Sequence, residues 1–184
     1  MRRAGSVELS AVTDSPRFSS ATFDPSVHDA TRFDSGEPDL DSWLRAHAAA
    51  AARARVAQTF VWVALGNREV VGYYALSAHA VPRGQAPSRI GRGVPDPVPA
   101  ALIVKLALDR SLHGRRLGDL LLVDALSRII DASETGPAVR AIVVEAATER
   151  GRALCARFGF VRAPGRDDRL IVRAETIANA LRQR

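Results

Sequence analysis

The chain has 184 residues with a formal net charge of +6, one cysteine and four histidines. This length fits one domain that buries roughly 70% of its unfolded surface, and the lone cysteine with its scattered histidines excludes an internal disulfide and gives no metal-site spacing. No apolar run reaches the roughly 18 to 20 residues of a membrane span and the N-terminus has no apolar signal core, so we expect a soluble, cytoplasmic protein.

The N-terminal half is expected to contain an extension, a helix and a hairpin. Residues 1–24 are rich in Ser, Thr, Ala and Asp with little periodicity, which predicts a flexible extension with at most a short strand at 7–12. Asp39 is a good N-cap for the alanine-rich segment that follows, so a helix is expected over 39–54. Two β runs at 59–65 and 69–78, separated by a glycine turn, predict an antiparallel hairpin.

Basic residues gather after this helix and after the hairpin. The stretch 81–99 is dense in Pro, Gly and Arg, which predicts a surface loop whose cations suit nucleic-acid phosphates. The two arginines at the end of the helix either complement its C-terminus or contact a phosphate backbone. The net charge favours an anionic partner, although a bias toward arginine explains it equally well. The candidate nucleic-acid contacts are Arg53, Arg55, Arg83, Arg89 and Arg92.

The stretch 102–130 organises the rest of the chain. An apolar run of strand length at 102–108 leads into a polar loop containing Gly114 and Gly118, and then into a segment with an apolar residue at every fourth position from Leu117 to Ile129. This pattern predicts strand, loop and helix. Free N–H groups and the helix dipole at such a helix start suit a phosphate, although for two glycines alone an ordinary crossover explains the pattern equally well.

The C-terminal third predicts a short series of alternating elements. An inner strand is expected at 141–146, a helix at 148–157, two strands at 160–162 and 170–173, and a last helix at 175–184. Residues 25–184 are therefore predicted to form a single domain.

Five segments together resemble the GNAT family of acetyl-CoA-dependent N-acyltransferases. They are HDATRFDSGEPDLDSWLRAHA (28–48), VVGYYALS (70–77), GVPDPVPA (93–100), KLALDRSLHGRRLGDLLLVDAL (105–126) and RFGF (157–160). The FDSG-x3-LDSWL, GYYALS and PDP motifs narrow the resemblance to the GNAT toxins of toxin–antitoxin pairs, over about residues 25–182. The resemblance implies an α/β fold with a mixed, mostly antiparallel central sheet, a splayed parallel strand pair and flanking helices.

The resemblance also implies an activity and partners. Similar proteins transfer acetyl from acetyl-CoA to the α-amine of the amino acid on a charged tRNA, which blocks translation. They are usually neutralised by a ribbon-helix-helix antitoxin and are often homodimers, and no metal is needed. Two other functions stay open: a GNAT acting on a small amine or a protein N-terminus, and a catalytically degenerate GNAT that only binds CoA. The sequence does not name the tRNA or amino acid.

The same resemblance assigns the acetyl-CoA site to the strand and loop at 106–119. The pantetheine arm would lie along the strand edge, the loop amides would hold the pyrophosphate, and a backbone N–H near Leu108 would polarise the thioester carbonyl. The implied cofactor-binding residues are Leu106, Ala107, Leu108, His113, Gly114, Arg115, Arg116, Leu117, Gly118 and Asp119.

Two residues depart from the family pattern. Arg116 stands where the loop has its middle glycine, so it either strains the loop and obstructs CoA or adds a charge-assisted phosphate contact. Cys155 stands where the family has the tyrosine that protonates the CoA thiolate, which makes it either a candidate general acid or a small buried hydrophobe. Tyr73, Tyr74 and Ser77, on the strand near the expected cleft, are the alternative proton donors.

Overall fold

The computed structural model describes residues 18–146 and 148–183. The strands are β1 (Phe18–Thr22), β2 (Gln58–Ala64), β3 (Val70–Val81), β4 (Val98–Leu108), β5 (Ala141–Glu145), β6 (Val161–Ala163) and β7 (Arg166–Arg173). The α-helices are α1 (Pro38–Ala46), α2 (Ala48–Arg53), α3 (Ser88–Gly91), α4 (Leu117–Thr135), α5 (Glu149–Arg157) and α6 (Ala174–Arg182), and short 3-10 helices lie at Arg83–Gln85 and Arg110–Leu112. Within the described residues, no helix is both long and apolar enough to cross a membrane.

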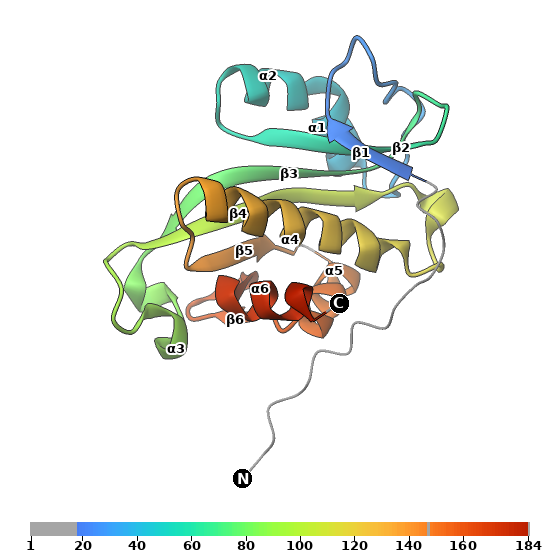
Figure 1. Ribbon diagram of the computed structural model, residues 1–184. Helices are drawn as coiled ribbons and strands as arrows, with labels where there is room; N and C mark the ends of the chain where they lie inside the picture. The colour runs from blue at the N-terminus through green and yellow to red at the C-terminus, as the bar shows by residue number, and fades with distance from the viewer. Residues whose placement is uncertain (1–17, 147, 184) are drawn as a thin grey trace.

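The described strands form one seven-stranded sheet in the order β1-β2-β3-β4-β5-β7-β6. Neighbouring strands are antiparallel except β4 and β5, which run parallel because α4 carries the chain back along the sheet between them (Figure 1). The predicted α/β fold with one parallel strand pair in a mostly antiparallel sheet is confirmed.

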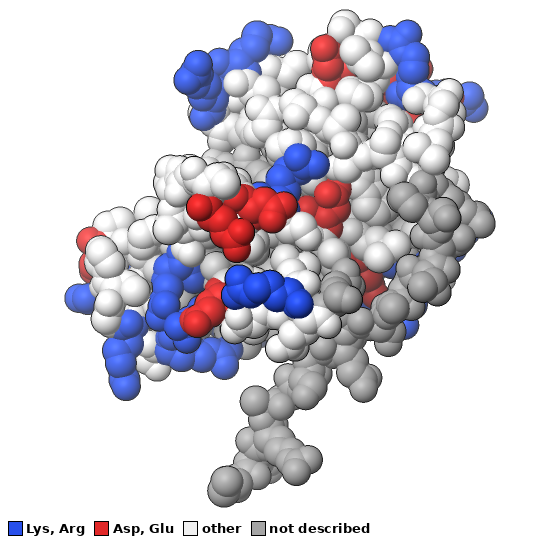
Figure 2. All heavy atoms as spheres, in the orientation of Figure 1, with Lys and Arg blue, Asp and Glu red and all other residues white. Residues whose placement is uncertain are grey.

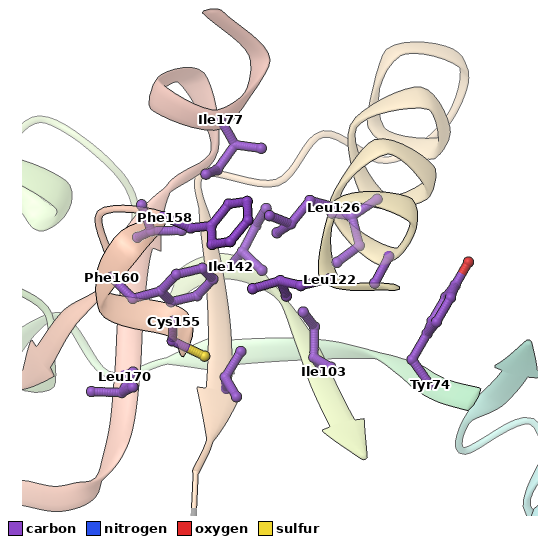
Figure 3. Close-up of a cluster of buried hydrophobic side chains, with 14 of the residues drawn as sticks. Tyr74, Ile103, Leu122, Leu126, Ile142, Cys155, Phe158, Phe160, Leu170 and Ile177 are labelled. Atoms are coloured by element: carbon purple, nitrogen blue, oxygen red, sulfur yellow. The ribbon is translucent and has the colours of Figure 1, made fainter. Parts of the chain in front are cut away.

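Helices cover both faces of this sheet. On one face, α4, α5 and α6 pack over a large apolar cluster that includes Leu122, Leu126 and Ile142 (Figure 3). On the other face, α1 and α2 pack through Leu44 and Ala48 over β2 and β3, and α3 packs through Ile90 over β4 and β5. The two faces have separate cores because neighbouring residues of a strand point to opposite sides.

Three local predictions were wrong in detail. Residues 18–22 were expected in the flexible extension but form β1, which pairs with β2 from Phe18 opposite Ala64 to Thr22 opposite Phe60. The helix expected over 39–54 begins at Pro38 and is divided at His47, whose φ of −116° interrupts the helical backbone. The loop expected at 81–99 contains the short helix α3, which forms because Ile90 is buried. The last two residues of this loop already belong to β4, which begins at Val98. The short strand expected at 7–12 lies outside the described residues.

Candidate active site

A cleft opens in the sheet where β4 and β5 stop pairing. Their parallel pairing ends at Ile103 and Val144, although β4 continues to Leu108. The register between β3 and β4 shifts at this point and leaves Val104 as an extra residue, a β-bulge that bends β4. The separated ends of β4 and β5 enclose a cavity of about 240 Å³. It is lined by Glu37, Asp39, Leu40, Ile103, Val104, Lys105, Leu106, Leu122, Val144, Glu145, Ala146, Thr148, Gly151, Leu154 and Cys155.

The loop between β4 and α4 presents a row of free backbone donors. Among the described residues, the N–H groups from Gly114 to Gly118 find no hydrogen-bond acceptor, and no side chain caps the N-terminus of α4. Gly114 has φ +78° and Arg116 has φ 57°, so the backbone turns sharply through this segment. Consecutive N–H groups at a helix N-terminus make a concave anion site, which fits the pyrophosphate of CoA.

His113 fastens this loop to β4. Its Nε2 lies 2.8 Å from the Leu108 carbonyl oxygen, and its Nδ1 lies 3.0 Å from Nη1 of Arg150. A carbonyl only accepts and a guanidinium only donates, so both bonds form when the imidazole is neutral with its proton on Nε2. His113 was predicted to bind the cofactor; the structure gives it an anchoring contact and leaves direct cofactor contact a prediction.

Arg116 occupies a backbone conformation that suits glycine. A left-handed conformation costs an ordinary residue about 1–2 kcal/mol, so the strain expected at this position is present. The side chain turns along α4, where Nε lies 3.5 Å from Oδ2 of Asp119, and its guanidinium is mostly exposed. This leaves the guanidinium at the rim of the loop.

Asp119 differs from the other residues predicted to bind the pyrophosphate. Its N–H donates to the Arg116 carbonyl oxygen at 3.1 Å, and its carboxylate pairs with Arg157 of α5 as well as with Arg116. An amide already bonded within the loop is not a free donor, and a carboxylate repels phosphate. These contacts tie α4 to α5 and weigh against the Asp119 amide as a pyrophosphate donor, a role that stays a prediction.

The strand residues Leu106, Ala107 and Leu108 lie on the part of β4 beyond the last β5 pairing. Leu106 lines the cavity, whereas Ala107 and Leu108 are buried in the cores on the two faces. The Leu108 carbonyl is occupied by His113. The backbone edge from Val104 onward has no partner strand on the β5 side among the described residues, so it offers hydrogen-bonding groups to the pantetheine arm.

The two strand tyrosines are engaged elsewhere. Tyr73 is fully buried against Trp43, and its hydroxyl donates to the Leu40 carbonyl oxygen at 2.8 Å. The Tyr74 hydroxyl accepts a bond from Arg128 on the opposite face. Burial raises the pKa of both phenols. The Ser77 hydroxyl donates to the Val56 carbonyl. None of the three lines the cleft as the structure describes it, which weighs against their replacing the family's acid; that alternative stays a prediction.

The five candidate nucleic-acid contacts form two exposed groups. Arg53 and Arg55 lie at the end of α2, and the other three, Arg83, Arg89 and Arg92, surround α3. None of their side chains pairs with a carboxylate among the described residues. Figure 2 shows basic side chains at the corner where α2 lies and acidic ones gathered over α4. Basic side chains without acidic neighbours at the α2 corner fit an anionic partner that binds there.

Cys155 lies in the wall of the cleft but belongs to the core. It is 3% exposed among Phe158, Phe160 and Leu170, and its sulfur turns in toward the sheet (Figure 3). Burial raises the pKa of the thiol to about 12. An ordinary thiol titrates near 8.5, so proton transfer from the buried Cys155 thiol to a CoA thiolate is unfavourable. The acid role of Cys155 stays a prediction, and this burial weighs against it.

Replacing Cys155 with alanine tests that role directly. If the buried thiol does not donate the proton, Cys155→Ala keeps acetyl transfer within about threefold of wild type and lowers stability by roughly 1 kcal/mol through the small cavity. The measurement is kcat for acetyl transfer between pH 6 and 10, together with urea unfolding. A loss of kcat beyond tenfold at unchanged stability would show that the thiol is the acid after all.

Sequence reasoning missed several groups that line the cleft. Glu37 is the N-cap residue of α1 and Asp39 lies in its first turn. Glu145 ends β5, and Thr148 caps α5 by accepting a bond from the Gly151 N–H at 3.1 Å. The cap is visible in the sequence as a threonine before a glycine-containing turn. No sequence pattern marks the three carboxylates, because only the fold brings the start of α1 and the end of β5 to the same cleft.

Solved structures have the same architecture. KacT, crystallised as a tyrosine-to-phenylalanine variant, matches with a TM-score of 0.82 at 24% identity over 89% of this chain and 99% of KacT. AtaT in complex with acetyl-methionyl-tRNAfMet matches with a TM-score of 0.81 at 24% identity over 89% of this chain and 99% of AtaT. AtaT has also been solved with the C-terminus of its antitoxin AtaR and acetyl-CoA. At this level of identity the similarity establishes the fold.

The fold, with its sheet split beside the donor loop, is the GNAT fold. No protein-family model matches the chain. A tRNA-acetylating toxin of Mycobacterium tuberculosis is 42% identical over 136 residues, which is 74% of this chain and 80% of that toxin. This chain belongs to the family of tRNA-acetylating GNAT toxins.

Proposed function

We propose that this protein transfers the acetyl group of acetyl-CoA to the α-amine of the amino acid on a charged tRNA, and so blocks translation. The observation that carries the proposal is the row of five free N–H groups from Gly114 to Gly118 beside the opening between β4 and β5. Free backbone donors beside an opening large enough for an acyl group support an acetyl-CoA site at this point. The tRNA-acetylating relative and the AtaT complex with acetylated tRNA support the choice of acceptor.

The chain's own groups hold the donor. The amides of Gly114 to Gly118 bind the pyrophosphate, and the free edge of β4 between Leu106 and Leu108 aligns the pantetheine arm. Bound in this way, acetyl-CoA supplies the activated acetyl group at the split. The N–H groups of β4 beyond the last β5 pairing are the groups that would stabilise negative charge on the thioester carbonyl oxygen.

The acceptor needs positioning more than a strong base. An α-amine titrates near 7.7 to 8.0, so a useful share is already neutral at physiological pH. Glu37 and Asp39 line the cleft and attract the ammonium form, which raises the local concentration of the acceptor. The amine nitrogen becomes cationic and acidic when it attacks the thioester. It can therefore protonate the departing CoA thiolate more easily than Cys155, whose thiol pKa is raised by burial.

The biological partners follow from this activity. Charged tRNA is the acceptor, and we infer a cytoplasmic location because charged tRNA is found there. A ribbon-helix-helix antitoxin is the expected partner, supported by the structures of AtaT with AtaR. The homodimer expected from the resemblance stays a prediction.

Acetyl transfer to a charged tRNA pool tests the proposed function. With labelled acetyl-CoA, we expect label on charged but not on deacylated tRNA, and mild alkali should release it as an N-acetyl amino acid. The rate should rise with pH through the α-amine titration near 8 and then level off. Label found only on a polyamine or on protein N-termini would favour the small-amine alternative, and no label on any acceptor would favour the degenerate one.

A further inference from the structure

Lys105 is an unpaired cation in the wall of the cleft. It is the only cation among the described residues that line the cavity, and the only lysine in the chain. Within the described residues it has no ion pair or hydrogen-bonding partner. The carboxylate on the facing strand, Glu145, is instead bound by Arg169, with Oε1 and Nη2 2.6 Å apart. The positive charge of Lys105 is therefore available to a ligand.

The bulge in β4 sets the side of the sheet on which Lys105 lies. Lys105 pairs with Ala75 and Leu106 pairs with Tyr74. Leu106 packs with the α4 cluster and Ala107 with the α1 cluster, so alternation puts Lys105 on the α1 side with Ala107. The donor loop begins α4 on the opposite face. Lys105 consequently lies on the sheet face that Glu37 and Asp39, the proposed acceptor-binding residues, also line.

A short path joins Lys105 to the exposed arginines of α2. Its partner Ala75 is followed two positions later on the same face of β3 by Ser77, roughly 7 Å along the strand. The Ser77 hydroxyl donates to the carbonyl of Val56, which follows Arg55 in the chain. The end of α2, with Arg53 and Arg55, is therefore connected to the part of the sheet that carries Lys105 through these β3 residues.

We propose that the Lys105 ammonium binds the phosphodiester that joins the last two nucleotides of the acceptor strand. This inference rests on the proposed function and adds to it the residue that holds the aminoacylated 3′ end at the split. One charge-assisted contact of this kind changes affinity by roughly ten- to a hundredfold. The carboxylates of Glu37 and Asp39 in the same cleft are left to the ammonium of the amino acid.

Two synthetic acceptors separate a phosphate contact from any other role. One is an aminoacyl-adenosine, which has no phosphate, and the other is the aminoacyl dinucleotide cytidylyl-adenosine, which has one phosphodiester. For wild type we expect the dinucleotide to have the higher kcat/KM by at least tenfold. In Lys105→Met this preference should collapse to less than threefold through a higher KM for the dinucleotide, and Lys105→Arg should restore most of it.

The matched control removes a charge at the other end of β3. Arg32→Met loses an exposed guanidinium that pairs with Glu69 at 3.6 Å, and it should keep the wild-type preference. A preference that survives in Lys105→Met would overturn the proposal. So would a fall in kcat of equal size for both acceptors, because that would place Lys105 at the chemical step. Failure of wild type to acetylate charged tRNA would instead reject the proposed function itself.

Discussion

Gly114→Ala is expected to weaken acetyl-CoA binding by at least tenfold. Gly114 has φ +78°, and a residue with a Cβ leaves this conformation or pays about 1–2 kcal/mol to keep it. Space is not the obstacle, because nothing lies within 4 Å of the position that a Cβ would take. Relaxation of the backbone turns the N–H groups of Gly114 and Arg115 away from the pyrophosphate, and each misdirected charge-assisted bond lowers affinity roughly tenfold or more.

Gly66 provides the matched control for this substitution. It has the same φ of +78°, also with nothing within 4 Å of its Cβ position, but it lies in the turn between β2 and β3. Both alanine variants should therefore lose a similar free energy of unfolding. Calorimetric titration with CoA should show weaker binding only for Gly114→Ala. Equal CoA affinity in the two variants would mean that the loop does not hold the pyrophosphate.

The order of elements was predictable because the periodicity of the sequence is strong. The run at 102–108 and the four-residue apolar repeat from Leu117 to Ile129 give β4 and α4 correctly. The resemblance gives the parallel pair, which local patterns cannot reveal because pairing depends on distant residues. β1 was missed because a short edge strand of FSSAT buries little apolar area, so its composition is that of a loop.

The candidate site was less predictable than the fold. The bulge at Val104 places Lys105 on the acceptor side, and no feature of LIVKLAL marks a bulge. The contact of His113 with Arg150 joins positions 37 residues apart, and only the packing of α5 against the loop brings them together. The raised pKa of Cys155 likewise depends on burial by three elements rather than on its neighbours in the chain. Sequence thus locates the loop, while tertiary contacts decide which of its groups are free.

Replacing Arg53, Arg55, Arg83, Arg89 and Arg92 together with glutamine is expected to lower the affinity for charged tRNA at least a hundredfold at physiological salt. These side chains are exposed and have no carboxylate partner among the described residues, so the substitutions remove phosphate-binding groups with little effect on stability. The dependence of log affinity on log salt should become shallower by roughly 0.7 to 0.9 for each phosphate that is no longer neutralised. Affinity for CoA should stay unchanged, because none of the five lines the cleft.

The salt dependence of tRNA affinity distinguishes binding at the arginines near α2 and α3 from a general effect of the protein's net charge. Arg32→Gln with Arg182→Gln removes two exposed guanidiniums, each 3.6 Å from a glutamate, away from α2 and α3. Net charge alone predicts a loss of affinity in proportion to the charge removed, whichever arginines are chosen. Binding across the two basic groups predicts that Arg53→Gln with Arg55→Gln flattens the salt dependence by more than one unit of slope, whereas the control pair leaves it within experimental error. Equal slopes for the two double variants would reject the assignment of tRNA contacts to these arginines.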